Sequence, residues 1–138
     1  FNLEMYEKEG AIKHLAKALK AKKSVSLLID QSVSSSDGQV VQFFGHRATQ
    51  VSSAAQLARK YDAAIIPVFL HNEDDDHYVL RFEEEILVQR SEDAKKDIRK
   101  ATQKQSDIIQ KLIEKEPDHW FWCHKRWKNE MPEIYSDL

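Results

Sequence analysis

The stretch from Ser91 to Glu116, SEDAKKDIRKATQKQSDIIQKLIEKE, decides the fold of this chain. It opens with Ser91-Glu92-Asp93, in which a side chain that can cap a helix precedes acidic residues suited to a first helical turn. Apolar residues then recur at helical spacing, at Ile98, Ala101, Ile108, Ile109, Leu112 and Ile113. Pro117 follows, and proline cannot continue a helix. The sequence therefore predicts one long helix over residues 91–116.

Helical patterns and short apolar runs alternate ahead of this helix. The spacing of apolar residues predicts helices over residues 7–21 and 49–61. Apolar runs bounded by polar residues predict strands over residues 24–29, 40–45, 63–70 and 77–88. We therefore expect an α/β fold, a layered domain with a mixed β-sheet flanked by helices. Because no linker or internal repeat is visible, we expect residues 1–138 to form a single domain.

The composition narrows the class of protein. The chain has 138 residues, 41% of them hydrophobic, which fits a globular domain with its own core. A net charge of −2, from 21 basic and 23 acidic residues, argues against a nucleic-acid partner. No apolar run approaches the roughly 20 residues of a membrane span, so we expect this fragment to be soluble. The chain begins at Phe1, and we expect an N-terminal membrane anchor to be absent from it.

Two short motifs stand where ligands commonly bind. Asp30-Gln31 follows an apolar run predicted to be a buried strand, and the ends of strands in α/β sheets often border ligand sites. The residues from Phe43 to Arg47, FFGHR, combine an apolar floor, a glycine that lets backbone approach a ligand, and a cation suited to phosphate. The alternatives are a turn aspartate and a strand end with core phenylalanines and a surface arginine.

Catalytic and metal-binding motifs are weak. His71 and Asp76 fit the acyltransferase spacing His-x-x-x-x-Asp, but they flank an acidic segment typical of a solvated turn. His119, Cys123 and His124 are close in sequence, yet no second ligand pair has the usual spacing. No nucleophile elbow supports Ser/His/Asp catalysis. We therefore expect no catalytic residue, no metal and no cofactor.

The segment after the long helix is rich in aromatic and basic residues. Residues 117–128, PDHWFWCHKRWK, hold all three tryptophans, and we call them the closing segment. We expect it to start a short last helix, with Trp120 and Trp127 on one face packed into the core. Its aromatic and basic side chains are equally typical of a membrane interface. Binding of single-stranded nucleic acid is a third reading that the overall charge argues against.

Five short blocks in fixed order carry a family resemblance: Gly10-Ala11-Ile12 with Ala18-Leu19-Lys20, Leu27 to Gln31, Val40 to Gly45, Ile65 to Val68, and Pro117-x-x-Trp120-x-Trp122-x-His124-x-Arg126-Trp127-Lys128. The last block is the most specific. Together they resemble the C-terminal portion of the bacterial lipid A biosynthesis acyltransferases, the late or secondary, lauroyl-type enzymes of lipopolysaccharide biosynthesis. The resemblance runs from Gly10 to about Lys128.

The resemblance implies the C-terminal half of a glycerolipid-acyltransferase-like fold. It also implies transfer of an acyl chain from an acyl carrier protein thioester to a hydroxyl of a lipid A precursor. The parent enzyme would act at the cytoplasmic face of the bacterial inner membrane. In the family the catalytic His-x-x-x-x-Asp/Glu lies upstream of the block that ends in Asp30-Gln31. We therefore expect this chain to lack the catalytic base and to be inactive alone.

The resemblance also implies site residues. The positions expected to border the substrate cleft are Asp30, Gln31, Phe44, Gly45 and Arg47. The side chains expected to be available to the membrane or to substrate phosphates are His124, Lys125, Arg126 and Lys128. The family often has threonine where this chain has Gln50, so no hydroxyl role is expected there. The alternative function is a non-catalytic module that binds anionic lipid or a carrier protein.

Overall fold

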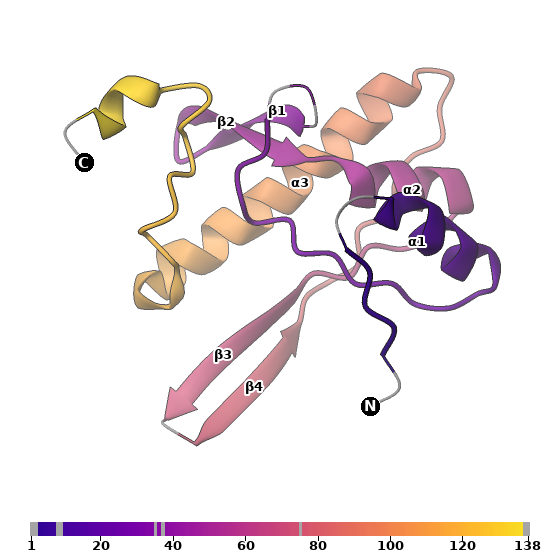
Figure 1. The fold of residues 1–138 in the computed structure, drawn as a ribbon, viewed down its shortest axis with the longest axis horizontal. Coiled ribbons are helices and arrows are strands. Elements are labelled where there is room, and N and C mark those ends of the chain that lie inside the picture. The colour runs from indigo at the N-terminus through magenta and orange to yellow at the C-terminus, as the bar shows by residue number, and fades with distance from the viewer. Residues whose placement is uncertain (1–2, 8–9, 35, 37, 75, 137–138) are drawn as a thin grey trace.

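The computed structural model describes residues 3–7, 10–34, 36, 38–74 and 76–136. Within them the chain has a mixed α/β fold, which confirms the predicted class (Figure 1). The elements are α1 (Ala11–Lys20), β1 (Gly38–Phe43), β2 (His46–Val51), α2 (Ser53–Tyr61), β3 (Val68–Asp74), β4 (His77–Phe82), α3 (Ala94–Lys115), and the 3₁₀ turns η1 (Pro117–His119) and η2 (Pro132–Tyr135). The first helix was predicted from residue 7, but residues 8–9 lie outside the described residues.

The described strands form two separate antiparallel hairpins, β1–β2 and β3–β4, instead of the single mixed sheet we expected. The run at residues 24–29 is not a strand: it is irregular and has no paired neighbour among the described residues. Side chains along it alternate between half-buried and exposed, and Leu28 is 90% exposed. An apolar run alone does not make a strand, because a strand needs a partner for its backbone groups.

The β1–β2 hairpin turns through Phe44 and Gly45. Both residues have positive φ, 51° and 75°, as a two-residue type I′ turn requires. This turn lets residues 46–51 pair with β1, from Phe43↔His46 to Gly38↔Val51. The predicted helix over residues 49–61 is therefore wrong at its start. Residues 49–51 complete β2, and α2 begins only at Ser53.

Helix α3 packs along β1 and closes the main core. The buried core residues are Val41, Phe43, Ala48, Ile109 and Ile113. Side-chain amides of α3 also make hydrogen bonds with backbone groups along the edge of β1 that β2 does not cover. Gln103 accepts from Gln42 N at 2.8 Å and donates to Gln42 O at 2.9 Å, while Gln110 accepts from Phe44 N at 2.7 Å. These amides occupy the place of a third strand, so the edge is covered rather than open.

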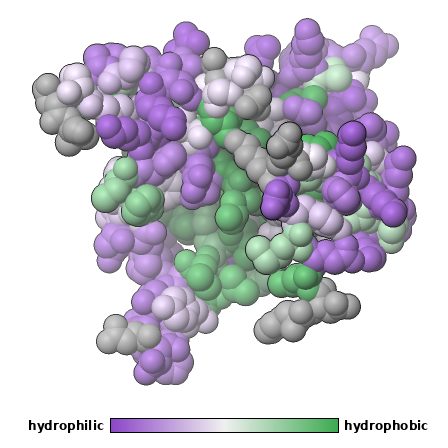
Figure 2. Space-filling view, viewed as in Figure 1, coloured by the Kyte–Doolittle hydropathy of each residue, from purple (hydrophilic) through white to green (hydrophobic). Residues whose placement is uncertain are grey.

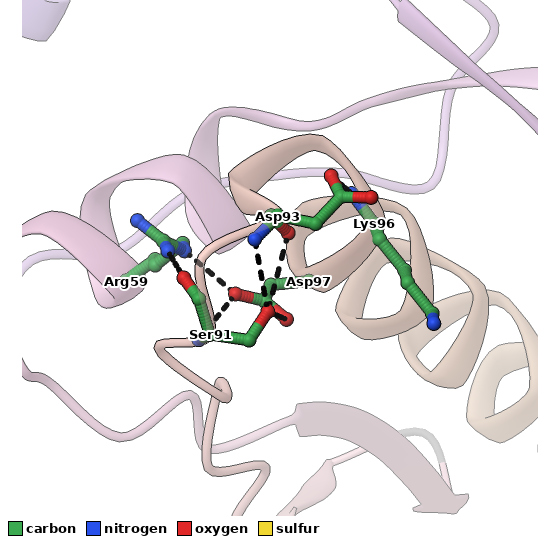
Figure 3. Close-up of polar contacts among 5 residues, drawn as sticks. All are labelled: Arg59, Ser91, Asp93, Lys96 and Asp97. Carbon is green, nitrogen blue, oxygen red and sulfur yellow. Dashed lines mark hydrogen bonds and ion pairs between the residues drawn. The ribbon is translucent and has the colours of Figure 1, made fainter.

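A polar cluster fixes the start of α3 against α2 (Figure 3). Asp93 caps the helix by accepting from Lys96 N at 2.9 Å. One turn later the buried Asp97 accepts from Ser91 Oγ at 2.8 Å and from Arg59 Nε at 3.0 Å. Arg59 also donates to Ser91 O at 2.5 Å. The predicted helix start near Ser91-Glu92-Asp93 is confirmed, and Pro117 lies just beyond its end.

The β3–β4 hairpin projects away from the other elements (Figure 1). The predicted strands at residues 63–70 and 77–88 are shorter or shifted here, although Ile65 and Ile86 still form an isolated bridge. One face of the hairpin is apolar and exposed; its residues are Val68, Leu70, Tyr78, Leu80 and Phe82. The inner face carries the half-buried Phe69, His71, Val79 and Arg81.

Apolar side chains also gather on the face seen in Figure 2, in a band bordered by hydrophilic surface. The structure thus exposes more apolar surface than scattered single residues would give. No helix in the described part of the chain is long and apolar enough to cross a membrane.

Candidate functional site

The closing segment is a series of turns and not the last α-helix we expected. Only η1, over Pro117–His119, has regular 3₁₀ geometry within it. Trp120 and Trp127 nevertheless pack against the core, with ring centroids 6.2 Å and 5.7 Å from that of Phe43. Trp122 and Phe121 are exposed. The packing interpretation therefore holds for two of the three tryptophans, without a helix to place them.

Arg126 lies at the centre of this packing and is only 1% exposed. Its Nη1 donates to Thr49 O, its Nη2 donates to Gln50 Oε1 at 3.2 Å, and its guanidinium carbon lies 5.0 Å from the Phe43 ring centroid. Burial lowers the pKa of Arg126 to about 10, although the Asp30 carboxylate opposes this change. The expectation that Arg126 is available to membrane or substrate phosphates is wrong, because β2 and Phe43 enclose it.

His124 and Asn129 hold the loop that follows Asp30-Gln31. His124 Nε2 accepts from Ser32 N at 2.8 Å. Asn129 Nδ2 lies within hydrogen-bonding reach of Ser32 Oγ, Val33 O and Thr49 Oγ1. The pKa of His124 is lowered, first by burial and then by Lys128 and Arg126. A neutral imidazole is the form that can accept the Ser32 hydrogen bond. The loop at Ser32 and Val33 is thereby joined to residues 124–129, and Asn129 also reaches Thr49 of β2.

The expected substrate-cleft residues fall into two groups. Asp30 is half-buried and close enough to Arg126 and His124 to raise the pKa of both, against the lowering by burial. It therefore lies beside the closing segment, while the neighbouring Gln31 is exposed. Phe44 and Gly45 form the turn that joins β1 to β2.

Arg47 lies along a groove between β1–β2 and α3. The groove has a volume of about 460 Å³ and is lined by Val40, Val41, Gln42, Arg47, Arg99, Lys100 and Gln103. The Arg47 side chain is 66% exposed, and its Nε lies 3.3 Å from Glu130 Oε2. Three cations over an apolar floor suit a ligand that carries both phosphate and hydrocarbon. Arg99 and Lys100 were not singled out from the sequence.

Lys125 and Lys128 remain exposed at the surface of the closing segment. Lys125 Nζ lies 5.6 Å from the Tyr135 ring centroid. Of the four side chains expected to meet membrane or phosphate, these two lysines are free to do so in this structure, while His124 and Arg126 are engaged within the protein.

His71 does not form a pair with Asp76. Its Nδ1 lies 2.7 Å from Glu116 Oε2, at the end of α3, whereas Asp76 is exposed at the β3–β4 turn. Arg81 Nη1 lies 2.5 Å from Glu116 Oε1, and this hydrogen bond is the main cause of a lowered pKa at Glu116. His119 from η1 completes the cluster. This group could not be recognised from the sequence, because its members come from β3, β4, the end of α3 and η1.

The comparisons with known proteins agree with the sequence blocks. The family model described as bacterial lipid A biosynthesis acyltransferase matches residues 1–129 of the 138-residue chain. A comparison with curated proteins found no match. The matched range takes in the Asp30-Gln31 loop, β1–β2, the groove beside α3 and the whole closing segment. On this match over nearly its whole length, the chain belongs to the bacterial lipid A biosynthesis acyltransferase family.

Proposed function

We propose that this chain is the C-terminal, substrate-binding part of an acyltransferase that moves an acyl chain from an acyl carrier protein thioester to a hydroxyl of a lipid A precursor. The parent enzyme works at the cytoplasmic face of the bacterial inner membrane. The observation that carries the proposal is the family match over residues 1–129. The basic groove beside Arg47 supports it, because a lipid A precursor combines phosphates with long hydrocarbon chains.

Arg47 is the proposed phosphate-binding residue of this groove. Asp30, Gln31, Phe44 and Gly45 are proposed to border the substrate cleft. The guanidinium of Arg47 is largely exposed and can reach both Glu130 and an incoming phosphate. A phosphate oxygen would compete for Arg47 with the Glu130 carboxylate, whose side chain is only 15% exposed.

In this proposal the catalytic base lies outside the chain. Acyl transfer to a hydroxyl needs a group that removes the proton as the thioester carbonyl is attacked. The only His-x-x-x-x-Asp/Glu spacing in the 138 residues is His71–Asp76, and the imidazole of His71 is paired with Glu116 instead. We therefore propose that the chain alone is inactive and that a base from outside it completes the site.

An acyl-transfer assay tests both parts of this proposal. The chain alone, incubated with labelled acyl carrier protein thioester and a lipid A precursor, should give no acylated product. In a family enzyme that carries the His-x-x-x-x-Asp/Glu pair, replacing the arginine equivalent to Arg47 with alanine should raise KM for the precursor. Transfer by the chain alone would place the base within it, and unchanged KM and kcat would remove the phosphate role of Arg47.

A non-catalytic lipid-binding module is the second candidate. The exposed apolar face of β3–β4, with Leu70 and Leu80 directly opposite each other, favours it. Cosedimentation with anionic and neutral vesicles separates the two candidates. A lipid-binding module should bind anionic vesicles, and each of Lys125→Ala and Lys128→Ala should weaken binding by about fivefold. The Leu70→Ser variant, which interrupts the apolar face, sets the baseline. If the chain is instead part of an acyltransferase that needs its catalytic half, the unaltered chain should bind vesicles no better than this variant.

A further inference from the structure

We propose that His71, Glu116 and His119 form a binding site for a transition-metal dication, with zinc as the ion to test. The inference is separate from the proposed acyl transfer and concerns a different part of the molecule. The three residues come from the inner face of β3, the C-terminal end of α3 and the turn η1. One ligand atom from each lies within 4.8 Å of the others.

The spacing of the donor atoms suits a small dication. Zinc binds imidazole nitrogen and carboxylate oxygen at about 2.0–2.2 Å, so donors around a tetrahedral ion lie about 3.4 Å apart. His71 Nδ1 lies 2.7 Å from Glu116 Oε2, and His119 Nδ1 lies 3.8 Å from the same oxygen. These separations bracket the required value. Two histidines and a glutamate are also a set of three protein ligands that zinc uses when its fourth position holds water.

The second ring nitrogen of His119 is already held. His119 Nε2 lies 3.2 Å from Asn72 O, where it can donate a hydrogen bond to that backbone carbonyl. A metal-binding histidine commonly donates its other ring N–H to a carbonyl or carboxylate, which fixes the tautomer and the ring orientation. Here this bond leaves Nδ1 as the nitrogen with the lone pair; Glu116 Oε2 lies 3.8 Å from it, and the His71 ring centroid lies 4.4 Å from that of His119.

Glu116 and His71 each have one potential ligand atom that no aligned hydrogen bond occupies. Arg81 Nη1 takes Glu116 Oε1, which orients the carboxylate and leaves Oε2 for the ion. His71 Nδ1 is shielded from solvent, and despite its short distance to Glu116 it makes no aligned hydrogen bond. A shielded ring nitrogen without an aligned partner costs free energy, and an ion between it and Oε2 would remove that cost.

The charges around the site decide which ions fit. Glu116 supplies one negative charge and Arg81 one positive charge, while Asp118, 3.5 Å from His119 Nδ1, supplies a second, exposed carboxylate. Two imidazole ligands disfavour calcium and magnesium, which prefer oxygen donors. Zinc, copper and nickel suit such a mixed nitrogen and oxygen set. Bound there, the ion would join the projecting β3–β4 hairpin to the end of α3.

A zinc titration by calorimetry tests the proposal on the 138-residue chain, with Cys123→Ser in every sample so that the free thiol cannot bind the ion. We expect one zinc ion per chain. His71→Gln and His119→Gln should each weaken binding by at least about tenfold. Cobalt(II) in place of zinc should give the strong visible absorption of a tetrahedral site, and both variants should lose it.

His77→Gln is the matched control. His77 lies on the same hairpin, and its Nδ1 is 2.7 Å from Asp74 Oδ1, so it resembles His71 but lies outside the cluster. It should bind zinc as the parent does. Absence of stoichiometric zinc binding would overturn the proposal, and so would an equal loss of affinity in His77→Gln; the cluster would then be an ion-pair network only. If circular dichroism shows that His71→Gln is unfolded, His119→Gln decides, because that side chain is one-third exposed and tolerates change.

Discussion

Replacing Arg126 with methionine should cost the protein about 3 kcal/mol of unfolding free energy. Methionine keeps much of the side-chain volume but removes the hydrogen bonds to Thr49 O and Gln50 Oε1. Bonds from a charged donor contribute about 2 kcal/mol each, and a desolvated cation over Phe43 adds about 2 kcal/mol. Against this total of about 6 kcal/mol stands the cost of burying the charge.

The pKa of Arg126 indicates the size of that cost after the opposing effects of Asp30 and Tyr135 are included. A fall from 12.5 to about 10 corresponds to about 3 kcal/mol in favour of the neutral form. The contacts therefore outweigh the burial by about 3 kcal/mol. For a chain of this length such a loss should lower Tm by about 10 °C. Arg126→Lys keeps the charge but not the planar fork, so it should lose less than methionine does.

Urea unfolding followed by tryptophan fluorescence measures this difference, since Trp120 and Trp127 lie on the same core. Lys125→Met and Lys128→Met are the matched controls, and as exposed cations they should change stability by less than about 0.5 kcal/mol. The reasoning is refuted if Arg126→Met is as stable as these controls. A loss of vesicle binding by all three variants alike, with stability unchanged, would restore the membrane role first expected for Arg126.

Three further predictions concern the start of α3, the loop clamp and the hairpin turn. Burial raises the pKa of Asp97, but hydrogen bonds from Ser91 and Arg59 outweigh it and leave the pKa lowered. This stabilisation is present above the unfolded pKa of about 3.9 and is lost as pH falls through the lower folded value, so Asp97→Asn should lower Tm at pH 7 and flatten the loss of Tm in acid. The lowered pKa of His124 likewise predicts that stability falls as pH drops below about 6.5. The His124→Gln variant, whose side chain can still accept from Ser32 N, should show a smaller change of stability with pH in this range. An unchanged pH dependence would contradict this prediction. Gly45→Ala should cost about 1 kcal/mol in urea unfolding, because φ is 75° and nothing lies within 4 Å of the added Cβ, and an unchanged midpoint would show that the turn can rearrange.

The parts of the fold that depend on neighbouring residues could be predicted from the sequence. The start of α3 near Ser91-Glu92-Asp93 and its stop before Pro117 are decided by backbone preferences over a few residues, although the capping side chain is Asp93 and not Ser91. The turn through Phe44 and Gly45 was not predicted, because residues 40–45 were expected to form one strand. The strand expected at residues 24–29 depended on a partner elsewhere in the chain. These residues are mostly apolar, but no described strand pairs with them, so they stay irregular.

In the candidate site, too, the features set by nearby residues could be predicted, and those set by distant contacts could not. The sequence identified Asp30 and the closing segment as important, and the structure brings them together through Arg126 and His124. The sequence could not show that Arg126 is buried while Lys125 and Lys128 are exposed. Charge and spacing are similar for Lys125, Arg126 and Lys128, and what distinguishes Arg126 is its contacts with Thr49 O, Gln50 Oε1 and the ring of Phe43.

The two histidines of the closing segment show why sequence proximity misled the search for a metal site. His119 and His124 are five residues apart, but they belong to different sides of the structure. His124 turns to the loop at Ser32, and its nitrogen is used by a backbone N–H. His119 turns to β3, where alternation along the strand brings His71 to the same inner face as Arg81. A strand periodicity of two and a helix that ends at Glu116 together create the cluster, so its ligands could be found only after the strand register and the helix end were known.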